Sequence, residues 1–283
     1  MTETKKHRWI DKKISTLHAE HDNAQIVDLL MNWRDRNPFV HHLLYTIGFA
    51  RQLADPGIAA VIYRAGAGRM IKAGPERTDE TLHFFGQWFR YGPHSEEGRA
   101  SIEKLNNIHR HFTISNPQFL YTLTTLCVYG DRFLRSIGLS SKSEHEKQAL
   151  AIFWRDVGAL MKLEDVPQDW NAFLSYYDDY EKAHFKPSDA GMQCCKVLID
   201  DFVRRWFSND PEKGRTFLLA HFDSRLRKVF PLKYPHAVQS FFLRKSTGLV
   251  ALYKRFKKPD AKEPRYVEDS FNPQRAQGAG APR

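Results

Sequence analysis

The sequence predicts an all-α fold in which the helices pack into a single globular domain. Apolar residues recur three and four positions apart along nearly the whole chain, which is the spacing of one helix face. No alternation of apolar and polar residues lasts long enough to form a sheet. The chain has 283 residues, 42% of them hydrophobic and 13% aromatic, so it can bury a full core around a cavity.

Capping residues and prolines mark most of the expected helix boundaries. Asp22 opens the first amphipathic run, which ends near Asn37, and Pro56 opens a short apolar helix. The loop at 66–68 is glycine-rich but lacks the Lys-Ser/Thr that a phosphate-binding loop needs. The expected helices cover residues 22–37, 39–53, 56–62, 77–91, 95–112, 116–136, 143–161, 168–184, 188–207 and 237–256, with two short helices after Asp210 and Asp223.

We expect four parts along the chain. They are an N-terminal helical segment over residues 1–36, a main domain over 37–235, a basic amphipathic helix over 236–258 and a disordered tail over 259–283. The tail is expected because its end contains mostly Pro, Gly, Gln, Ala and Arg, which offer little apolar surface to bury.

The helix expected over 236–258 carries part of the formal net charge of +10. Arg244, Lys245, Lys254 and Arg255 flank an apolar stripe there. Such a helix either lies on an anionic membrane surface or packs on the domain with its lysines extended into solvent. The basic residues do not alternate with aromatic residues along one face, so we expect no nucleic-acid partner.

The three cysteines, Cys127, Cys194 and Cys195, form no CxxC pair, which argues against a structural zinc site. Without a signal peptide they indicate a reducing compartment. The longest apolar run, over residues 119–128, is too short to span a bilayer. We therefore expect a cytoplasmic protein whose membrane contact, if any, is peripheral and made through 236–258.

His109 is the first candidate site residue. Ile102, Leu105, Ile108, His109 and Phe112 fall on one face of their predicted helix. An imidazole on an apolar face is desolvated, which favours the neutral form that binds a metal. The alternative is a core histidine whose ring bonds a backbone carbonyl.

Arg77 and Thr81 lie four residues apart and therefore share a helix face. Aromatic residues that continue near that face are Phe84, Phe85 and Trp88. A guanidinium there suits a propionate, a bound anion or negatively polarised dioxygen. The alternative is a helix N-terminus capped by Thr78 or Asp79, with Arg77 in solvent.

Around these residues the sequence resembles the catalytic domain shared by the fungal MpaB oxygenases and the bacterial rubber oxygenases, or latex clearing proteins. The family's Arg-x-x-x-Thr falls on Arg77 and Thr81, and its haem-binding histidine falls on His109. The likeness covers residues 45–190. Further matching strings are Tyr91-Gly92-Pro93, Asn106-x-x-His109, Asn116-x-x-x-Leu120-Tyr121-Thr122-Leu123, Phe153-Trp154-Arg155-Asp156-Val157-Gly158, Asp165-Val166-Pro167 and Tyr180-Glu181.

The resemblance implies that the main domain, 37–235, is an all-helical catalytic domain that binds haem b in a pocket between helices. His109 would be the iron ligand, and Arg77 and Thr81 would bind the haem and act in catalysis beside it. The implied enzyme is a haem-dependent oxygenase that uses dioxygen on an apolar, isoprenoid or otherwise unsaturated substrate.

The apolar lining is our own expectation from the sequence, and the chain departs from the family pattern at one position. Phe85 and Trp88 are expected to contact the cofactor, with Phe84 and Leu120 as further lining. Rubber oxygenases carry a lysine, thought to help cleavage, where this chain has Glu80. An acidic residue there is typical of the MpaB branch, so rubber cleavage is not expected.

Two other functions fit parts of the sequence. Glu80-x-x-His83 and Glu181-x-x-His184 have the spacing of the paired motifs in a di-iron carboxylate bundle. Further ligands for that metal site would come from Glu20, Glu103 and Glu146. The other candidate is a non-catalytic helical protein that keeps the scaffold and binds lipid or protein.

Overall fold

The computed structural model describes residues 8–257 and 260–271. All regular structure within these ranges is helical, which confirms the all-α prediction. A π-helix, η1 (Leu29–Arg34), continues α2, and a 3-10 turn, η2 (Arg64–Gly66), follows α4. The α-helices are α1 (Trp9–Ile14), α2 (Asn23–Asp28), α3 (Pro38–Gln52), α4 (Pro56–Tyr63), α5 (Arg69–Lys72), α6 (Gly74–Tyr91), α7 (Glu96–His109), α8 (Asn116–Ser136), α9 (Glu144–Leu160), α10 (Trp170–His184), α11 (Asp189–Trp206), α12 (Pro211–Ala220), α13 (Ser224–Val229), α14 (Ala237–Lys257) and α15 (Val267–Ser270).

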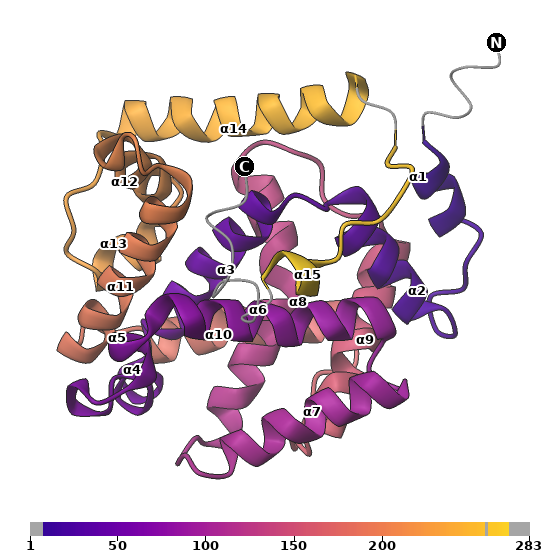
Figure 1. Cartoon of the computed structure of the whole chain (residues 1–283), viewed down its shortest axis with the longest axis horizontal. Coiled ribbons are helices and arrows are strands. Elements are labelled where there is room, and N and C mark those ends of the chain that lie inside the picture. The colour runs from indigo at the N-terminus through magenta and orange to yellow at the C-terminus, as the bar shows by residue number, and fades with distance from the viewer. Residues whose placement is uncertain (1–7, 258–259, 272–283) are drawn as a thin grey trace.

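α6 crosses the middle of the molecule, and several helices pack on it (Figure 1). α7, α2 and α15 contact α6 directly, while α8 packs against α3, α9 and α10. α11 contacts both α3 and α4 and so connects the C-terminal helices to this bundle. α14 lies along one edge of the molecule, where it packs mainly on α12 (Figure 1).

Local sequence signals position α9 and α10 as expected. The Ser143 hydroxyl accepts a hydrogen bond from the Glu146 amide at 3.2 Å, and the Glu146 carboxylate accepts one from the Ser143 amide at 2.9 Å. This reciprocal pair is a capping box, which satisfies two amides that the first helical turn leaves free. Asp169 caps α10 in a similar way through the amide of Ala172.

α6 begins earlier than the sequence predicts. It starts at Gly74, with Pro75 in its first turn, instead of near residue 77. Thr78 and Asp79, the caps considered from sequence, are therefore inside the helix and buried. Asp79 instead pairs with Arg205 of α11 at 2.9 Å. That partner is distant in sequence, so a local reading of capping residues does not find it.

α7 ends earlier than the sequence predicts, at His109 rather than at residue 112. The amide of Phe112 bonds the carbonyl of His109 at 2.9 Å, which tightens the chain into a turn after the last helical residue. The end of α7 therefore places His109 at the point where the chain turns towards α8.

The two ends of the described chain meet on α6 and η1. The amide of Arg265 bonds the backbone carbonyl of Asn32 at 2.9 Å, and the amide of Val267 bonds the Asn32 side chain at 3.1 Å. α15 then packs on α6 at Gly86, where a Cβ atom would lie 2.2 Å from the amide nitrogen of Glu268. Only glycine permits so close an approach of the two backbones.

Residues 260–271 fall in the segment that the sequence analysis assigns to a disordered tail. The structure differs from that expectation here, because Val267 and Phe271 are buried against the domain. The prediction for 272–283 concerns residues outside those described, and the boundaries at 36, 235 and 258 stay predictions. No helix in the described ranges combines the length and hydropathy of a membrane span.

Candidate active site

An enclosed cavity of ≈510 Å³ lies between α3, α4, α6, α7 and α8. Its volume falls within the range of about 300–1,000 Å³ that is common for small-molecule sites. The five site residues predicted from the sequence all line this one cavity, and they are Arg77, Thr81, Phe85, Trp88 and His109. The structure therefore brings together side chains from two separate stretches of the chain.

His109 contributes a neutral imidazole to the cavity. Its ring lies 5.0 Å from the ring of Phe119, centre to centre. Its Nδ1 is buried and has no hydrogen-bond partner in the described part of the chain. Burial, followed by the nearby positive charge of Arg77, lowers the pKa of His109 to about 4. The carbonyl-bonded core histidine, which the sequence left open, is therefore not what the described residues form.

Arg77 lies at the cavity without a carboxylate partner among the described residues. Its Nη1 donates one long hydrogen bond, 3.5 Å, to the hydroxyl of Tyr45. Its guanidinium stacks over the ring of Phe49, 4.6 Å from the ring centre. Buried cations are normally paired, so a half-buried guanidinium held only by a phenol and a ring is available to a bound anion.

Thr81 lies one helical turn after Arg77 on the same face of α6. Its hydroxyl donates a hydrogen bond to the Arg77 carbonyl at 2.8 Å. With its proton committed to the backbone, the Thr81 oxygen can only accept a hydrogen bond from a group in the cavity. This geometry follows from the i, i+4 spacing that singled out the pair in the sequence.

Tyr45 of α3 is a site residue that the sequence reasoning missed. It is buried and lines the cavity, and its ring stacks on Phe49 at 5.5 Å between ring centres. Burial raises the pKa of Tyr45, while the charge of Arg77 opposes that rise. The i, i+4 pair of aromatic residues in a predicted helix was the available signal, but it is common in ordinary cores.

Aromatic rings of α6 and α9 form another part of the cavity lining. Trp88 lies 5.5 Å from Phe85 and 6.2 Å from Trp154 between ring centres. The indole nitrogen of Trp88 donates to Ser101 at 3.2 Å, so its polar atom is satisfied away from the cavity. The wall therefore presents hydrocarbon alone.

Two further expectations about the lining have different outcomes. Phe84 lines the cavity as expected. Leu120 is buried but does not line it; its α8 neighbours Phe119 and Leu123 do. The phase of α8 turns Leu120 to another face of the helix, which explains the error.

Glu80, at the place of the rubber-oxygenase lysine, is already paired. Its carboxylate accepts from Arg69 at 2.6 Å near the edge of the cavity. Arg64 and Lys72 also line this edge, and the Arg64 guanidinium lies 5.6 Å from the ring centre of Phe112. The edge is therefore cationic, while the interior is apolar.

The structure does not assemble the di-iron site. The carboxylate of Glu181 is buried and accepts from Arg51 at 2.7 and 2.8 Å, from Arg225 and from Tyr121. Glu146 pairs with Arg34. Within the described ranges, the one group of side chains close enough to share a metal ion is an exposed cluster of His18, Glu20 and His21. The paired Glu-x-x-His motifs are thus a coincidence of sequence.

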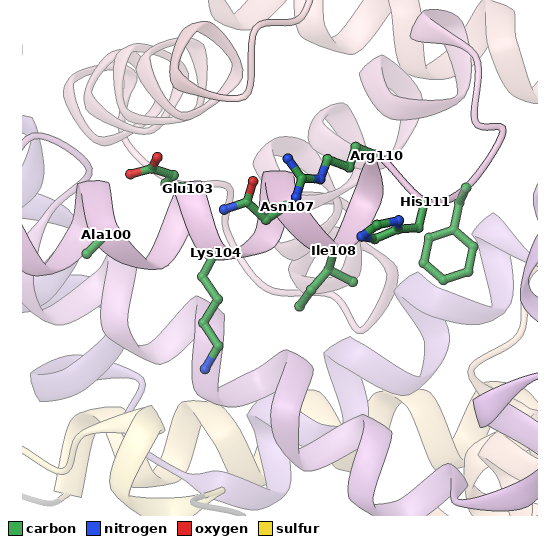
Figure 2. A pocket seen from close by; sticks show the side chains of 8 residues that line it. Ala100, Glu103, Lys104, Asn107, Ile108, Arg110 and His111 are labelled. Atoms are coloured by element: carbon green, nitrogen blue, oxygen red, sulfur yellow. The ribbon is translucent and has the colours of Figure 1, made fainter.

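A second, open depression of ≈580 Å³ follows the outer side of α7 (Figure 2). Glu103, Asn107 and Arg110 point to one side of the helix there, and Lys104 points to the other. His111 lies in this depression and is exposed. The two nearby histidines therefore face different environments, and only His109 has the dry surroundings of a ligand.

The profile of the family described as "ER-bound oxygenase mpaB/B'/Rubber oxygenase, catalytic domain" matches residues 40–249. The chain belongs to this family. The match confirms the resemblance and gives the chain an oxygenase kind of function. It starts close to the predicted domain boundary at residue 37 and extends into α14. No curated protein matches the chain.

Proposed function

We propose that this member of the mpaB and rubber oxygenase family is a haem b-dependent oxygenase that uses dioxygen on an apolar substrate. The observation that carries the proposal is the buried Nδ1 of His109, which has no hydrogen-bond partner among the described residues. It shares an apolar cavity with the guanidinium of Arg77, which has no carboxylate partner among them. A folded protein keeps neither group unpartnered without a reason, because each costs free energy in a dry site.

The residues present fit haem b. The group is a flat, largely apolar ring that ends in two carboxylates, and the cavity has an apolar interior with cations at one edge. His109 would supply the ligand nitrogen, since its ring is neutral at physiological pH. Arg64, Lys72 and Arg77 offer positive partners for the two carboxylates.

When bound, the haem iron supplies the redox chemistry of dioxygen, and the protein sets its surroundings. Arg77 provides a fixed positive charge and N–H donors beside a developing anion. Thr81 holds an acceptor oxygen on the same face. The rings of Phe85, Trp88 and Trp154 exclude water and leave a polar substrate without partners.

The substrate class follows from the same lining. A cavity of hydrocarbon walls favours an apolar molecule, such as an isoprenoid or otherwise unsaturated chain. Glu80, paired with Arg69, occupies the position of the lysine thought to help rubber cleavage. We therefore do not extend rubber cleavage to this chain.

An absorption spectrum of the purified protein, with iron quantified on the same sample, tests the proposal. We expect a Soret band with about one iron per chain. His109→Ala should lose the band, whereas the matched control His111→Ala should keep it, because His111 is exposed on the outer side of α7. A His109→Ala protein with full haem content would refute the ligand assignment.

Two other outcomes would overturn the proposal as a whole. About two irons per chain without a Soret band would indicate a di-iron protein. Neither haem nor iron, after expression with a haem precursor, would indicate a helical scaffold that binds lipid or protein without catalysis.

A further inference from the structure

α14 carries its large apolar side chains on the side that faces away from the protein. Of the nine large hydrophobic residues that are exposed in the described part of the chain, seven lie on this helix. Phe242 and Leu249 are 64% and 66% exposed, although both are large. The seven residues are Val238, Phe241, Phe242, Leu249, Val250, Leu252 and Tyr253.

The opposite face of α14, which contacts the domain, is small or polar. Ser240 is buried, and the hydroxyl of Thr247 lies 3.2 Å from Nε2 of His221. Gly248 lies so close to the carbonyl of Ile137 that a Cβ atom would approach it to 2.1 Å. An ordinary surface helix turns its apolar stripe to the core. α14 does the reverse, so its apolar stripe is available to something outside the chain.

The charge of the protein is concentrated in the same segment. Residues 224–259 contain ten of the 43 Lys and Arg residues and none of the 33 Asp and Glu residues. The remaining 33 basic residues equal the acidic residues in number, so the rest of the chain is neutral. The whole formal charge of +10 is therefore matched by residues 224–259, which include α14 and the residues directly before and after it.

The exposed apolar stripe of α14 and the positive charge around it together indicate what kind of partner covers this face. A second copy of the chain would bring another ten positive charges against the first, which disfavours association through this face. The surface of an anionic bilayer offers both an apolar layer and negative headgroups. α14 has 21 residues, so it can lie along a bilayer over about 30 Å.

We propose that α14 docks this protein on an anionic phospholipid bilayer. Phe242, Leu249 and Tyr253 enter the interfacial layer, and Lys254, which is exposed, lies beside the headgroups. The helix stays parallel to the membrane plane, since it does not have the hydropathy of a span. The proposal stands apart from the haem site, because it depends on no residue of the cavity.

Sedimentation with lipid vesicles tests the proposal on the full chain. We expect strong binding to vesicles of phosphatidylcholine and phosphatidylserine in equal parts, and weak binding to phosphatidylcholine alone. Binding should fall as salt is added, because the headgroup attraction is screened. Equal binding to both kinds of vesicle, or to neither, would overturn the proposal.

Variants then assign the binding to α14. Replacing Phe242, Leu249 and Tyr253 together by Gln should lower the partition coefficient about tenfold or more. Lys254→Gln should lower it about fivefold. Tyr91→Gln is the matched control, because it removes an exposed aromatic residue from α6 and should change nothing. A triple variant that binds as well as the natural chain would overturn the assignment.

Hydrogen exchange of the natural chain covers the case in which the triple variant does not fold. Anionic vesicles should slow the exchange of the exposed amides of α14, and unchanged exchange overturns the proposal. Sedimentation velocity without lipid tests whether the chain forms a dimer through α14. A stable dimer that the triple variant abolishes would show that a second copy, and not a bilayer, covers this face.

Discussion

Arg51 and Arg77 are two arginines in the same helical domain with opposite surroundings. The Arg51 side chain is 3% exposed and fully paired: it donates to both carboxylate oxygens of Glu181, at 2.7 and 2.8 Å, and to Asp223 at 2.8 Å. Arg77 has one long hydrogen bond to Tyr45 and no carboxylate among the described residues.

The difference separates a structural cation from a binding one. Arg51 joins α3 to α10 and to the residue before α13, so its charge holds helices together. Arg77 has its charge directed to a cavity whose walls are apolar. A charge that no described carboxylate of the chain neutralises is one that a bound molecule can neutralise. Partners, more than burial, therefore distinguish the two roles.

The largest expected effect comes from breaking the paired cluster. Glu181→Gln keeps the size of the side chain but leaves Arg51 buried without its main counter-charge. We expect a loss of about 3–5 kcal/mol in the free energy of unfolding, measured by urea denaturation. Asp179→Asn on the same helix is the control. Its pair with Lys182 is exposed and screened by solvent, so its loss should leave the stability almost unchanged. Similar losses of unfolding free energy in both variants would mean that the buried pair contributes no more to stability than the exposed pair.

The next effect is a pH dependence caused by His109. In the unfolded chain His109 is protonated with the ordinary pKa of 6.5, whereas in the folded chain its pKa is about 4. The free energy of unfolding should therefore fall as the pH drops through this window. In the haem-free chain we expect His109 to account for at most about 2 kcal/mol between pH 7 and pH 5.

His109→Leu isolates this contribution, because the variant has no imidazole to protonate. The stability of the natural chain relative to His109→Leu should decline from pH 7 to pH 5, as followed by urea denaturation at each pH. A constant difference between the two proteins would mean that the imidazole is not held neutral.

A smaller effect is expected at Arg77. Arg77→Met removes a charge that is neutralised by no carboxylate in the described ranges, so in the haem-free chain the free energy of unfolding should change by about 1 kcal/mol or less. Arg51→Met should be the more damaging substitution, since it leaves Glu181 without its main partner. Equal losses in thermal or urea unfolding would give Arg77 a structural role and remove the distinction.

The smallest effect is expected on α14. Leu249→Gln should change the free energy of unfolding by no more than about 0.5 kcal/mol, because the side chain is 66% exposed. Leu218→Gln on α12, where the side chain is fully buried, should destabilise the chain by several kcal/mol. A large loss at Leu249 would mean that its side chain is covered within the chain itself.

The family resemblance, together with helix periodicity, was sufficient to group the central residues of the candidate site. Periodicity alone left His109 open to an ordinary core role and Arg77 open to a place at a helix start, and the family strings selected both residues together with Thr81. The structure brings all three to one cavity. The periodicity that predicts a helix also predicts which residues share its face, and that is enough when the site lies on two helix faces.

What the sequence could not supply depends on contacts between distant segments. Tyr45 resembles any core aromatic residue until Arg77 lies beside it. Asp79 looked like a helix cap because its ion pair with Arg205, more than a hundred residues further on, cannot be read from the local sequence. Glu181 matched a metal-ligand motif until Arg51 and Arg225 neutralised it. In each case the sequence identified the side chain but could not identify the residue that it contacts in the folded chain.

The packing of the segment 260–271 on η1 has a consequence for how relatives are compared. Met31 and Val267 line the cavity, yet both lie outside the residues that match the family profile. One wall of the pocket is thus built by segments that flank the catalytic domain. Two relatives with the same His and Arg positions can therefore share a chemistry and differ in the shape of molecule they admit, solely through their terminal segments.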